Sequence, residues 1–405
     1  MKTFLDISPF VPYTECALFQ QGGIIMLCVK NGTLFTLAQE QEFTGDILVK
    51  DGKIVEIGQN LSGKADELVD ATGLYVFPGF IDAHSHLGLS GYAMRFEGMD
   101  YNELTDSLTP HLEAIDAFNP LDETVKSAAL GGITVVGTGP GSANVLGGTF
   151  IAVKTSGVRV DDMIVKRKAA MKCAFGENPK FCYKEKDNAS RMSVAAKLRT
   201  MIQKTRMYVA KKEQAGNDLS KLPAFDEKLE AMIPVINKEI PLKAHAHRAD
   251  DIFTALRVAR EMDVLITLEH CTEGHLIAEH LAKENVRIAV GPSLGHATKI
   301  ELRNKSFKTP GVLSKAGCKV SIITDAPVIP QEYLPLCAGL AIKSGMDKNE
   351  ALKAITINPA EHLGIANRVG SLEVGKDADF VITDGCPFEL ETKVLRVFID
   401  GKEVQ

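Results

Sequence analysis

The sequence lacks the features that mark membrane-spanning, secreted or nucleic-acid-binding proteins. No stretch is apolar for long enough to span a bilayer, and residues 1–25 carry charged and polar side chains where a signal peptide has an unbroken apolar core. The formal net charge of −6 provides no basic stripe for nucleic acid or an anionic membrane. We therefore expect a cytoplasmic protein whose partners include neither nucleic acid nor a membrane.

Closely spaced cysteines are also lacking. The eight cysteines are scattered along the chain, and none belongs to a CxxC pair. A small secreted protein held together by disulfides has a much denser pattern, so reduced thiols in a cytosol are the simpler interpretation.

The chain is too long for a single small core. Its 405 residues exceed the size at which one hydrophobic core usually stops growing, and its composition, 45% hydrophobic and 24% charged, is that of an ordinary globular protein. One large barrel with a smaller unit is the expected organisation. Residues 1–25 are expected to form an N-terminal extension, because strand patterns begin only near Met26.

Short strands and tight turns fill both ends of the chain. Asp-Gly pairs at 51–52 and 400–401 each separate two short runs of alternating apolar residues. Asp-Gly supplies the positive φ angles that a two-residue hairpin turn requires. Residues 26–77 and 366–405 are therefore predicted to build one small β-sandwich together.

The middle of the chain, residues 78–365, alternates strand and helix patterns, which indicates parallel βα units. The eight strand candidates are YVFPGFIDAH, ITVVGTG, FIAVKTSG, AMKCAFG, IPLKAHAH, VLITLEHC, VRIAVGPS and KVSIITDAP. Helical patterns occur at 249–261, 274–284 and 331–345. Eight parallel strands with helical crossovers predict the α/β class and a (β/α)8 TIM barrel. Two segments fit less well: the short TGPGSANVLGG between the second and third strands, and a helical insertion at 188–238.

Histidines and carboxylates gather at the ends of the predicted barrel strands. His84 and His86 follow the apolar run VFPGFIDA, and residues two apart in a strand face the same side, so both imidazoles should point into the barrel at its C-terminal rim. Four further strand ends carry Glu177, His245, His270 and Asp325. Imidazole and carboxylate together suit zinc or a similar divalent ion. The sequence therefore predicts a metal site at this rim.

Three residues near the rim are candidates for substrate binding. His247 shares the strand face of the fifth-strand histidine, and a bond to a neighbouring carbonyl is an equally good explanation for it. Arg248 can clamp a substrate carboxylate with two hydrogen bonds, although pairing with Asp250 or Asp251 is the favoured alternative. His296, after the seventh strand, either faces the pocket or is a loop histidine without a catalytic role.

An ordered set of motifs resembles a known family. PGFIDAHSH, KAHAHRADDI, LEHC, TDAP and the tail NPAEHLGI…GSLEVGKDADFVI are similar to the amidohydrolase superfamily, and in particular to its imidazolonepropionase- and prolidase-like branch, over about residues 26–405. The resemblance implies a TIM barrel, a flanking β-sandwich and a mono- or binuclear metal centre. It places the metal ligands at His84, His86, His245, His270 and Asp325.

The same resemblance implies a bridging acidic group in binuclear members, either a glutamate or a carboxylated lysine. Glu177 lies just past its strand, where a rim ligand belongs. Lys154 ends the preceding predicted strand, and Lys172 lies near the start of the AMKCAFG strand. Glu177 is therefore preferred, then Lys154, then Lys172.

The groups at the rim predict a hydrolytic mechanism. A divalent cation lowers the pKa of a bound water toward ~7 and polarises a carbonyl. Asp325 is expected to accept the proton of the attacking water and deliver it to the leaving nitrogen. His270, if it is not a ligand, can stabilise the oxyanion.

We expect a metal-dependent amidohydrolase with one or two divalent ions, zinc being preferred. Its small-molecule substrate is expected to be an N-acyl amino acid, a dipeptide or a cyclic amide. A heterocycle deaminase on the same scaffold is the nearest alternative, because it uses the same ligands. A non-catalytic scaffold is disfavoured, since it has no need of this ligand set. Assembly into a homo-oligomer is compatible with the sequence.

Overall fold

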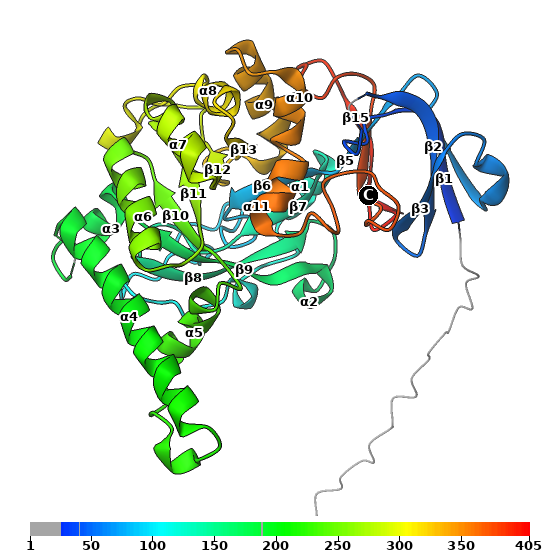
Figure 1. Cartoon of the computed structure of the whole chain (residues 1–405). Coiled ribbons are helices and arrows are strands. Elements are labelled where there is room, and N and C mark those ends of the chain that lie inside the picture. Colours follow the sequence, from blue (N-terminus) through cyan, green and yellow to red (C-terminus); the bar gives the residue numbers. More distant parts are fainter. Residues whose placement is uncertain (1–25, 40, 188) are drawn as a thin grey trace, which may run out of the picture.

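The computed structural model describes residues 26–39, 41–187 and 189–405, so the predicted N-terminal extension lies outside the described residues. The described chain forms two eight-stranded sheets, one made of strands from both chain ends and one that curls into a nearly closed barrel. Figure 1 shows the terminal sheet beside the barrel, with helices over the outside of the barrel. The α/β class predicted from the sequence is confirmed.

The terminal sheet joins the two ends of the chain because β14 pairs antiparallel with β5. Its strands are β1 (Met26–Leu34), β2 (Phe43–Lys50), β3 (Lys53–Gly58), β4 (Glu67–Asp70), β5 (Tyr75–Pro78), β14 (Phe380–Thr383), β15 (Val394–Ile399) and β16 (Lys402–Glu403). Both Asp-Gly pairs form hairpin turns as predicted: φ is 50° and 74° at residues 51–52, and 48° and 70° at 400–401. The division at residues 77 and 366 stays a prediction.

The barrel sheet keeps the order of the sequence. Its strands are β6 (Phe80–Ser85), β7 (Ile133–Thr138), β8 (Leu146–Lys154), β9 (Ile164–Ala174), β10 (Leu242–Ala246), β11 (Ile266–His270), β12 (Arg287–Val290) and β13 (Lys319–Ile322). The first and last strands approach each other at the rim, where the backbone nitrogen of His86 donates to the carbonyl of Ala326 at 2.7 Å. The strand ends that carry the candidate ligands therefore meet at one mouth.

Helices connect most of the barrel strands. They are α1 (Glu123–Leu130), α2 (Val160–Met163), α3 (Glu177–Cys182), α4 (Arg191–Ala215), α5 (Glu227–Ile236), α6 (Ala249–Glu261), α7 (Ala278–Glu284), α8 (Thr309–Lys315), α9 (Leu334–Lys343), α10 (Lys348–Lys353) and α11 (Ile357–Leu363). Short 3-10 helices are η1 (Ser62–Lys64), η2 (Ala114–Asp116), η3 (Leu219–Lys221), η4 (Gly274–Leu276), η5 (Ile300–Leu302) and η6 (Gln331–Tyr333). Across the described part of the chain, no helix combines the length and apolar character needed to cross a membrane.

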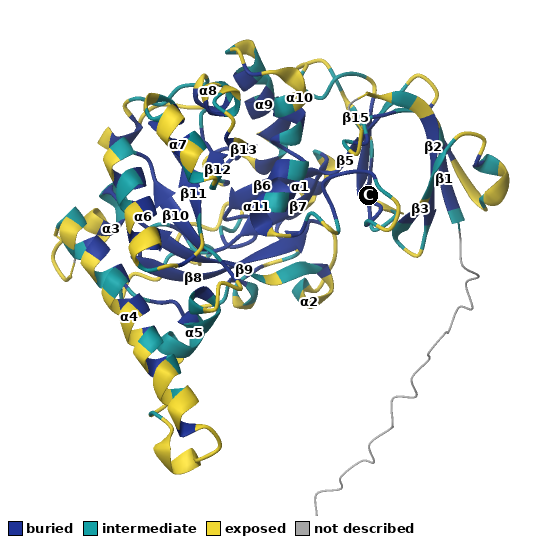
Figure 2. Ribbon diagram, in the orientation of Figure 1, coloured by how far each residue is buried: buried dark blue, intermediate teal, exposed yellow. Residues whose placement is uncertain are grey.

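The helical insertion expected at 188–238 forms α4 and α5. Ser190 caps the start of α4, since its side chain accepts a hydrogen bond from the backbone nitrogen of Ser193. The far end of α4 extends away from the barrel, and Figure 2 shows that this end is largely exposed.

The prediction of eight parallel strands is wrong at β8. This strand pairs antiparallel with both β7 and β9, while the other pairs in the barrel sheet are parallel. The physical reason is the length of the connection. Only residues 139–145 join β7 to β8, whereas a parallel crossover needs a dozen or more residues.

The first predicted barrel strand, YVFPGFIDAH, is two strands. It breaks at Gly79, so β5 joins the terminal sheet and β6 joins the barrel. A Cβ at Gly79 would lie 2.1 Å from Thr134 Oγ1, so only glycine allows the two sheets to approach this closely.

The reversal of β8 carries Lys154 to the end of the barrel that faces the terminal sheet. There its buried Nζ contacts Asp379, and lies 3.0 Å from Asp377 Oδ2 and 3.2 Å from Asp400 Oδ1. Burial lowers the pKa of the Lys154 ammonium, but the three carboxylates outweigh burial and raise it. Lys154 therefore ties the barrel to the terminal sheet, far from the predicted bridging position.

We expect Lys154→Met to lower the free energy of unfolding by about 3–5 kcal/mol, because it leaves the buried carboxylate of Asp379 without its cation, whereas Asp377 keeps Lys53 and Arg368. The matched control is Lys168→Met, which removes a partly exposed partner of Glu113 and should cost at most ~1 kcal/mol. Urea unfolding followed by circular dichroism measures both. An equal loss of unfolding free energy in the two variants would contradict a stabilising role for the cluster around Lys154.

Candidate metal centre

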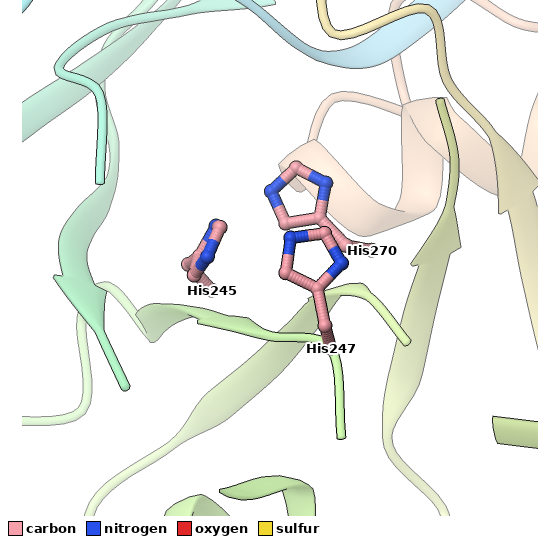
Figure 3. A group of neighbouring side chains, drawn as sticks. All are labelled: His245, His247 and His270. Carbon is pink, nitrogen blue, oxygen red and sulfur yellow. The ribbon is translucent and has the colours of Figure 1, made fainter. Parts of the chain in front are cut away.

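Five histidines surround the mouth of the barrel. His84 lies in β6 and His86 directly follows it; His245 lies in β10 and His247 directly follows it; His270 is the last residue of β11. All five are buried. Figure 3 shows three of them, His245, His247 and His270, with their rings gathered around one space.

Fixed acceptors orient three of these imidazoles through Nδ1. The bonds are His84 Nδ1 to Glu269 Oε2 (3.0 Å), His86 Nδ1 to Gly139 O (2.7 Å) and His270 Nδ1 to Gly291 O (2.8 Å). Because a carbonyl or carboxylate only accepts, Nδ1 carries the proton in each ring and the lone pair of the neutral imidazole is on Nε2. Burial lowers the pKa of His84 well below its usual value and that of His270 to about 4, so both are neutral.

Asp325 faces these lone pairs. Its Oδ1 lies 3.3 Å from His86 Nε2 and 3.5 Å from His84 Nε2. Lone pairs that face a carboxylate repel it unless positive charge lies between them. The donor set therefore fits a divalent cation, and neutral imidazoles with a carboxylate are ligands that zinc accepts.

Two groups of candidate ligands meet at His270. In the described residues, the ligand atoms of His84, His270 and Asp325 lie within 4.8 Å of one another, and so do those of His245, His247 and His270. Both ring nitrogens of the buried His245 are without a hydrogen-bond partner. Buried polar atoms in folded proteins are almost always satisfied, so an unpartnered imidazole here is suited to ligation.

Lys172 lies in the centre, although the sequence ranked it last as a bridging group. Its fully buried Nζ is 3.1 Å from His84 Nε2. Burial lowers the pKa of Lys172 to about 8. β9 begins at Ile164, well before the predicted strand start, so Lys172 is near the end of its strand rather than near the start.

A charged network below the mouth was not foreseen. Glu269 is fully buried, and its carboxylate contacts Lys243 Nζ at 2.9 Å and His362 Nε2 at 2.9 Å in addition to His84. Burial raises the pKa of Glu269, but Lys243, His362 and His84 lower it well below the usual value. The signal in the sequence is the charged residue inside each of the apolar strands LKAHAH and LITLEH.

Three predicted site residues are not brought into the cluster. Glu177 heads α3, and its backbone nitrogen donates to Glu301 Oε2 at 3.0 Å. Arg248 forms two hydrogen bonds of 2.9 and 2.8 Å with Asp250, which was the favoured alternative. His296 is exposed on the loop after β12.

A hollow of about 410 Å³ reaches the centre from outside, and its lining includes His86, Ala326 and Tyr92. A second aromatic ring, that of Tyr101, stacks on His86 at 5.0 Å with an interplanar angle of 21°. The hollow has the size of a small-molecule pocket, and His86 and Ala326 are part of its wall.

Comparison with known proteins agrees with this fold and this site. Residues 75–404 match the amidohydrolase family, and the chain belongs to that family. Membership confirms the class predicted from the sequence, a hydrolase that acts on carbon–nitrogen bonds. A solved structure of an amidohydrolase from Thermotoga maritima MSB8 is 41% identical, with a TM-score of 0.90 over 94% of this chain and 99% of that chain.

Curated relatives carry different names. An imidazolonepropionase of Syntrophobacter fumaroxidans is 26% identical over 373 residues, which cover 84% of each protein. A 5'-deoxyadenosine deaminase of Methanobrevibacter smithii is 24% identical over 382 residues, 88% of this chain and 84% of that protein. Amidohydrolase tasK of Hapsidospora irregularis is 26% identical over 392 residues, 88% of this chain, but the chain spans only 39% of the length of tasK.

Proposed function

We propose that the chain is a metal-dependent amidohydrolase that hydrolyses an amide-type carbon–nitrogen bond in an N-acyl amino acid, a dipeptide or a cyclic amide. The observation that carries this proposal is the convergence of imidazole lone pairs from His84 and His86 on the carboxylate of Asp325. Family membership supports it.

Five residues would hold one or two divalent ions, with zinc preferred for this mixture of imidazole and carboxylate. They are His84, His86, His245, His270 and Asp325. A bound ion supplies an activated water at neutral pH and polarises the scissile carbonyl. Three of these residues are prepared for ligation, since burial holds His84, His245 and His270 neutral.

Asp325 is the proposed proton shuttle. Its Oδ1 faces the histidine cluster and its side chain is 16% exposed, and the hollow beside His86 is lined by the next residue, Ala326. Asp325 accepts the proton of the attacking water and then donates it to the leaving nitrogen. His270 donates from Nδ1 to the Gly291 carbonyl and presents the lone pair of Nε2 to the mouth, so it is proposed as a metal ligand rather than as the group that stabilises the oxyanion.

Lys172 is the proposed bridging group, ahead of Glu177. The neutral amine of Lys172 would add to CO2: an N–C bond forms, the π bond of one C=O opens to leave a carboxylate oxygen, and one proton passes to solvent, which gives a carbamate. Its 3.1 Å distance from His84 supports the choice, whereas Glu177 contacts Glu301. Lys154 belongs to the cluster at the opposite end of the barrel.

We expect Lys172→Ala to lose metal and to recover part of it when short carboxylic acids are added, because such an acid replaces the missing carbamate. Glu177→Gln should keep the full metal content. Metal analysis of the purified variants measures this. Full occupancy in Lys172→Ala, or loss in Glu177→Gln, would contradict the assignment.

We expect the purified protein to hold at least one divalent metal ion per chain, and His84→Ala combined with His86→Ala to remove most of it, because the pair supplies two ligands on one strand. The control removes two histidines outside the centre, His275→Ala with His280→Ala, and should retain the metal. Elemental analysis and thermal melting are recorded on the same preparations. Full occupancy in the His84/His86 variant would exclude this site.

We expect Asp325→Asn to lower kcat by several orders of magnitude, since a positioned acid–base group alone contributes ~10²–10⁴-fold. Metal content and melting temperature should change little, because the histidines remain. The substrate comes from a screen of N-acyl amino acids, dipeptides and cyclic amides. A metal-replete Asn variant within a few-fold of wild type would show that another group carries the proton.

A heterocycle deaminase is the second candidate, and similarity to a 5'-deoxyadenosine deaminase supports it. The two candidates differ in product, because a deaminase releases ammonia. The same screen decides between them when ammonia is scored separately from amino acid.

A cytoplasmic location and assembly into a homo-oligomer stay predictions. The seven cysteines in the described residues are all free, as a reducing compartment would leave them.

A further inference from the structure

The hollow beside His86 has an apolar surface that adjoins the proposed metal centre. The apolar side chains of its wall include Leu87, Ala326, Pro327 and Pro330. The first two of these directly follow the proposed ligands His86 and Asp325 in the sequence. With a volume of about 410 Å³, the hollow has room for an extended aliphatic chain that begins at the centre.

The same wall carries negative charge. Glu123, in the first turn of α1, and Glu332, in η6, both line the hollow. In the part of the chain that the structure describes, no lysine or arginine lines it. The charge inside the hollow is therefore not balanced by a basic side chain of its own wall.

A buried amide in the wall has an unused acceptor. Gln331 is 1% exposed, and its Nε2 donates to Asp82 Oδ2 at 2.7 Å. The same Oδ2 accepts the backbone nitrogen and the hydroxyl of Thr324 at 2.9 and 2.7 Å, so it is an acceptor and the NH2 end of the amide must face it. Oε1 of Gln331 has no hydrogen-bond partner. Since buried polar atoms are almost always satisfied, this oxygen is suited to a donor on a bound molecule.

The start of α1 does not make the hollow a site for anions. A helix N-terminus attracts negative charge, but Asp122 Oδ1 already accepts the backbone nitrogen of Thr124 at 3.0 Å. Glu123 adds a second negative charge in the same turn. A ligand that suits this wall has an aliphatic chain and ends in a cation with N–H donors.

We propose that the hollow is a subsite for a basic side chain of the substrate, an ammonium or guanidinium group at the end of an aliphatic chain. The aliphatic part packs on Leu87 and the two prolines. Oε1 of Gln331 accepts a hydrogen bond from the cation, and Glu123 and Glu332 supply the opposite charge. This inference rests on the proposed function, because it narrows the substrate of that site to an N-acyl amino acid or dipeptide with a basic side chain.

The test is a calorimetric titration of the metal-loaded, full-length chain with butylguanidinium and with its uncharged isostere, butylurea. A guanidinium group stays protonated at neutral pH and has no lone pair for a metal ion, so its binding does not depend on coordination. Wild type should bind butylguanidinium at least ~10-fold more tightly, because hydrogen bonds that involve a charged group are stronger than neutral ones. Equal affinity for the two molecules, or no binding of butylguanidinium, overturns the inference.

Glu123→Gln combined with Glu332→Gln should reduce this preference to less than ~3-fold, because both negative charges of the wall are removed. The matched control is Glu279→Gln, which removes an exposed carboxylate from the first turn of α7 and should keep the wild-type preference. Thermal melting shows that each variant is folded. A folded double variant with the wild-type preference overturns the inference.

Gln331→Lys provides a second arm, which leaves both glutamates in place. Lysine keeps a donor for Asp82 but replaces the free acceptor with a cation, so butylguanidinium should bind at least ~10-fold more weakly. Unchanged binding by the folded variant contradicts the subsite. The proposed function fails separately: if the preference for butylguanidinium stands but no N-acyl amino acid, dipeptide or cyclic amide is hydrolysed, the reaction is wrong and the cation subsite is not.

Discussion

The mouth of the barrel depends on one electrostatic constraint: neutral imidazole nitrogens are held against carboxylates in a buried space, and positive charge is needed between them. The backbone imposes this arrangement. The carbonyls of Gly139 and Gly291 fix the rings of His86 and His270 through Nδ1, so their Nε2 atoms cannot turn away. Burial then keeps the ring of His270 neutral and ready to bind a cation.

The same electrostatic constraint applies to the buried residues below the mouth of the barrel. Glu269 holds the ring of His84 on one side and the ammonium of Lys243 on the other, so a proposed ligand is hydrogen-bonded to a buried ion pair. Partners of this kind usually set the orientation and basicity of metal ligands. At the far end of the barrel, Lys154 and three aspartates form another buried cluster, which fastens the terminal sheet. Ionic contacts therefore organise both ends of an otherwise apolar barrel.

The sequence predicted the parts that strand periodicity and turn chemistry determine. The Asp-Gly hairpins, the helix at 249–261 and the convergence of His84 with Asp325 follow from local patterns that the fold preserves. Those local patterns could not predict how segments far apart in the sequence are arranged. An apolar run has no direction, so the reversal of β8 was missed, and with it the true position of Lys154.

Lys172 replaces Glu177 as the proposed bridging group for a similar reason. AMKCAFG is the apolar half of a longer strand whose first residues are partly exposed, so the alternation that marks a strand was weak there. The central claim, that divalent metal binds where His84, His86 and Asp325 meet, is tested most directly by anomalous diffraction at the zinc edge from crystals of the zinc-loaded chain. We predict a peak about 2.0–2.2 Å from the Nε2 atoms of His84 and His86. A zinc-saturated crystal with no peak at this position would contradict the claim.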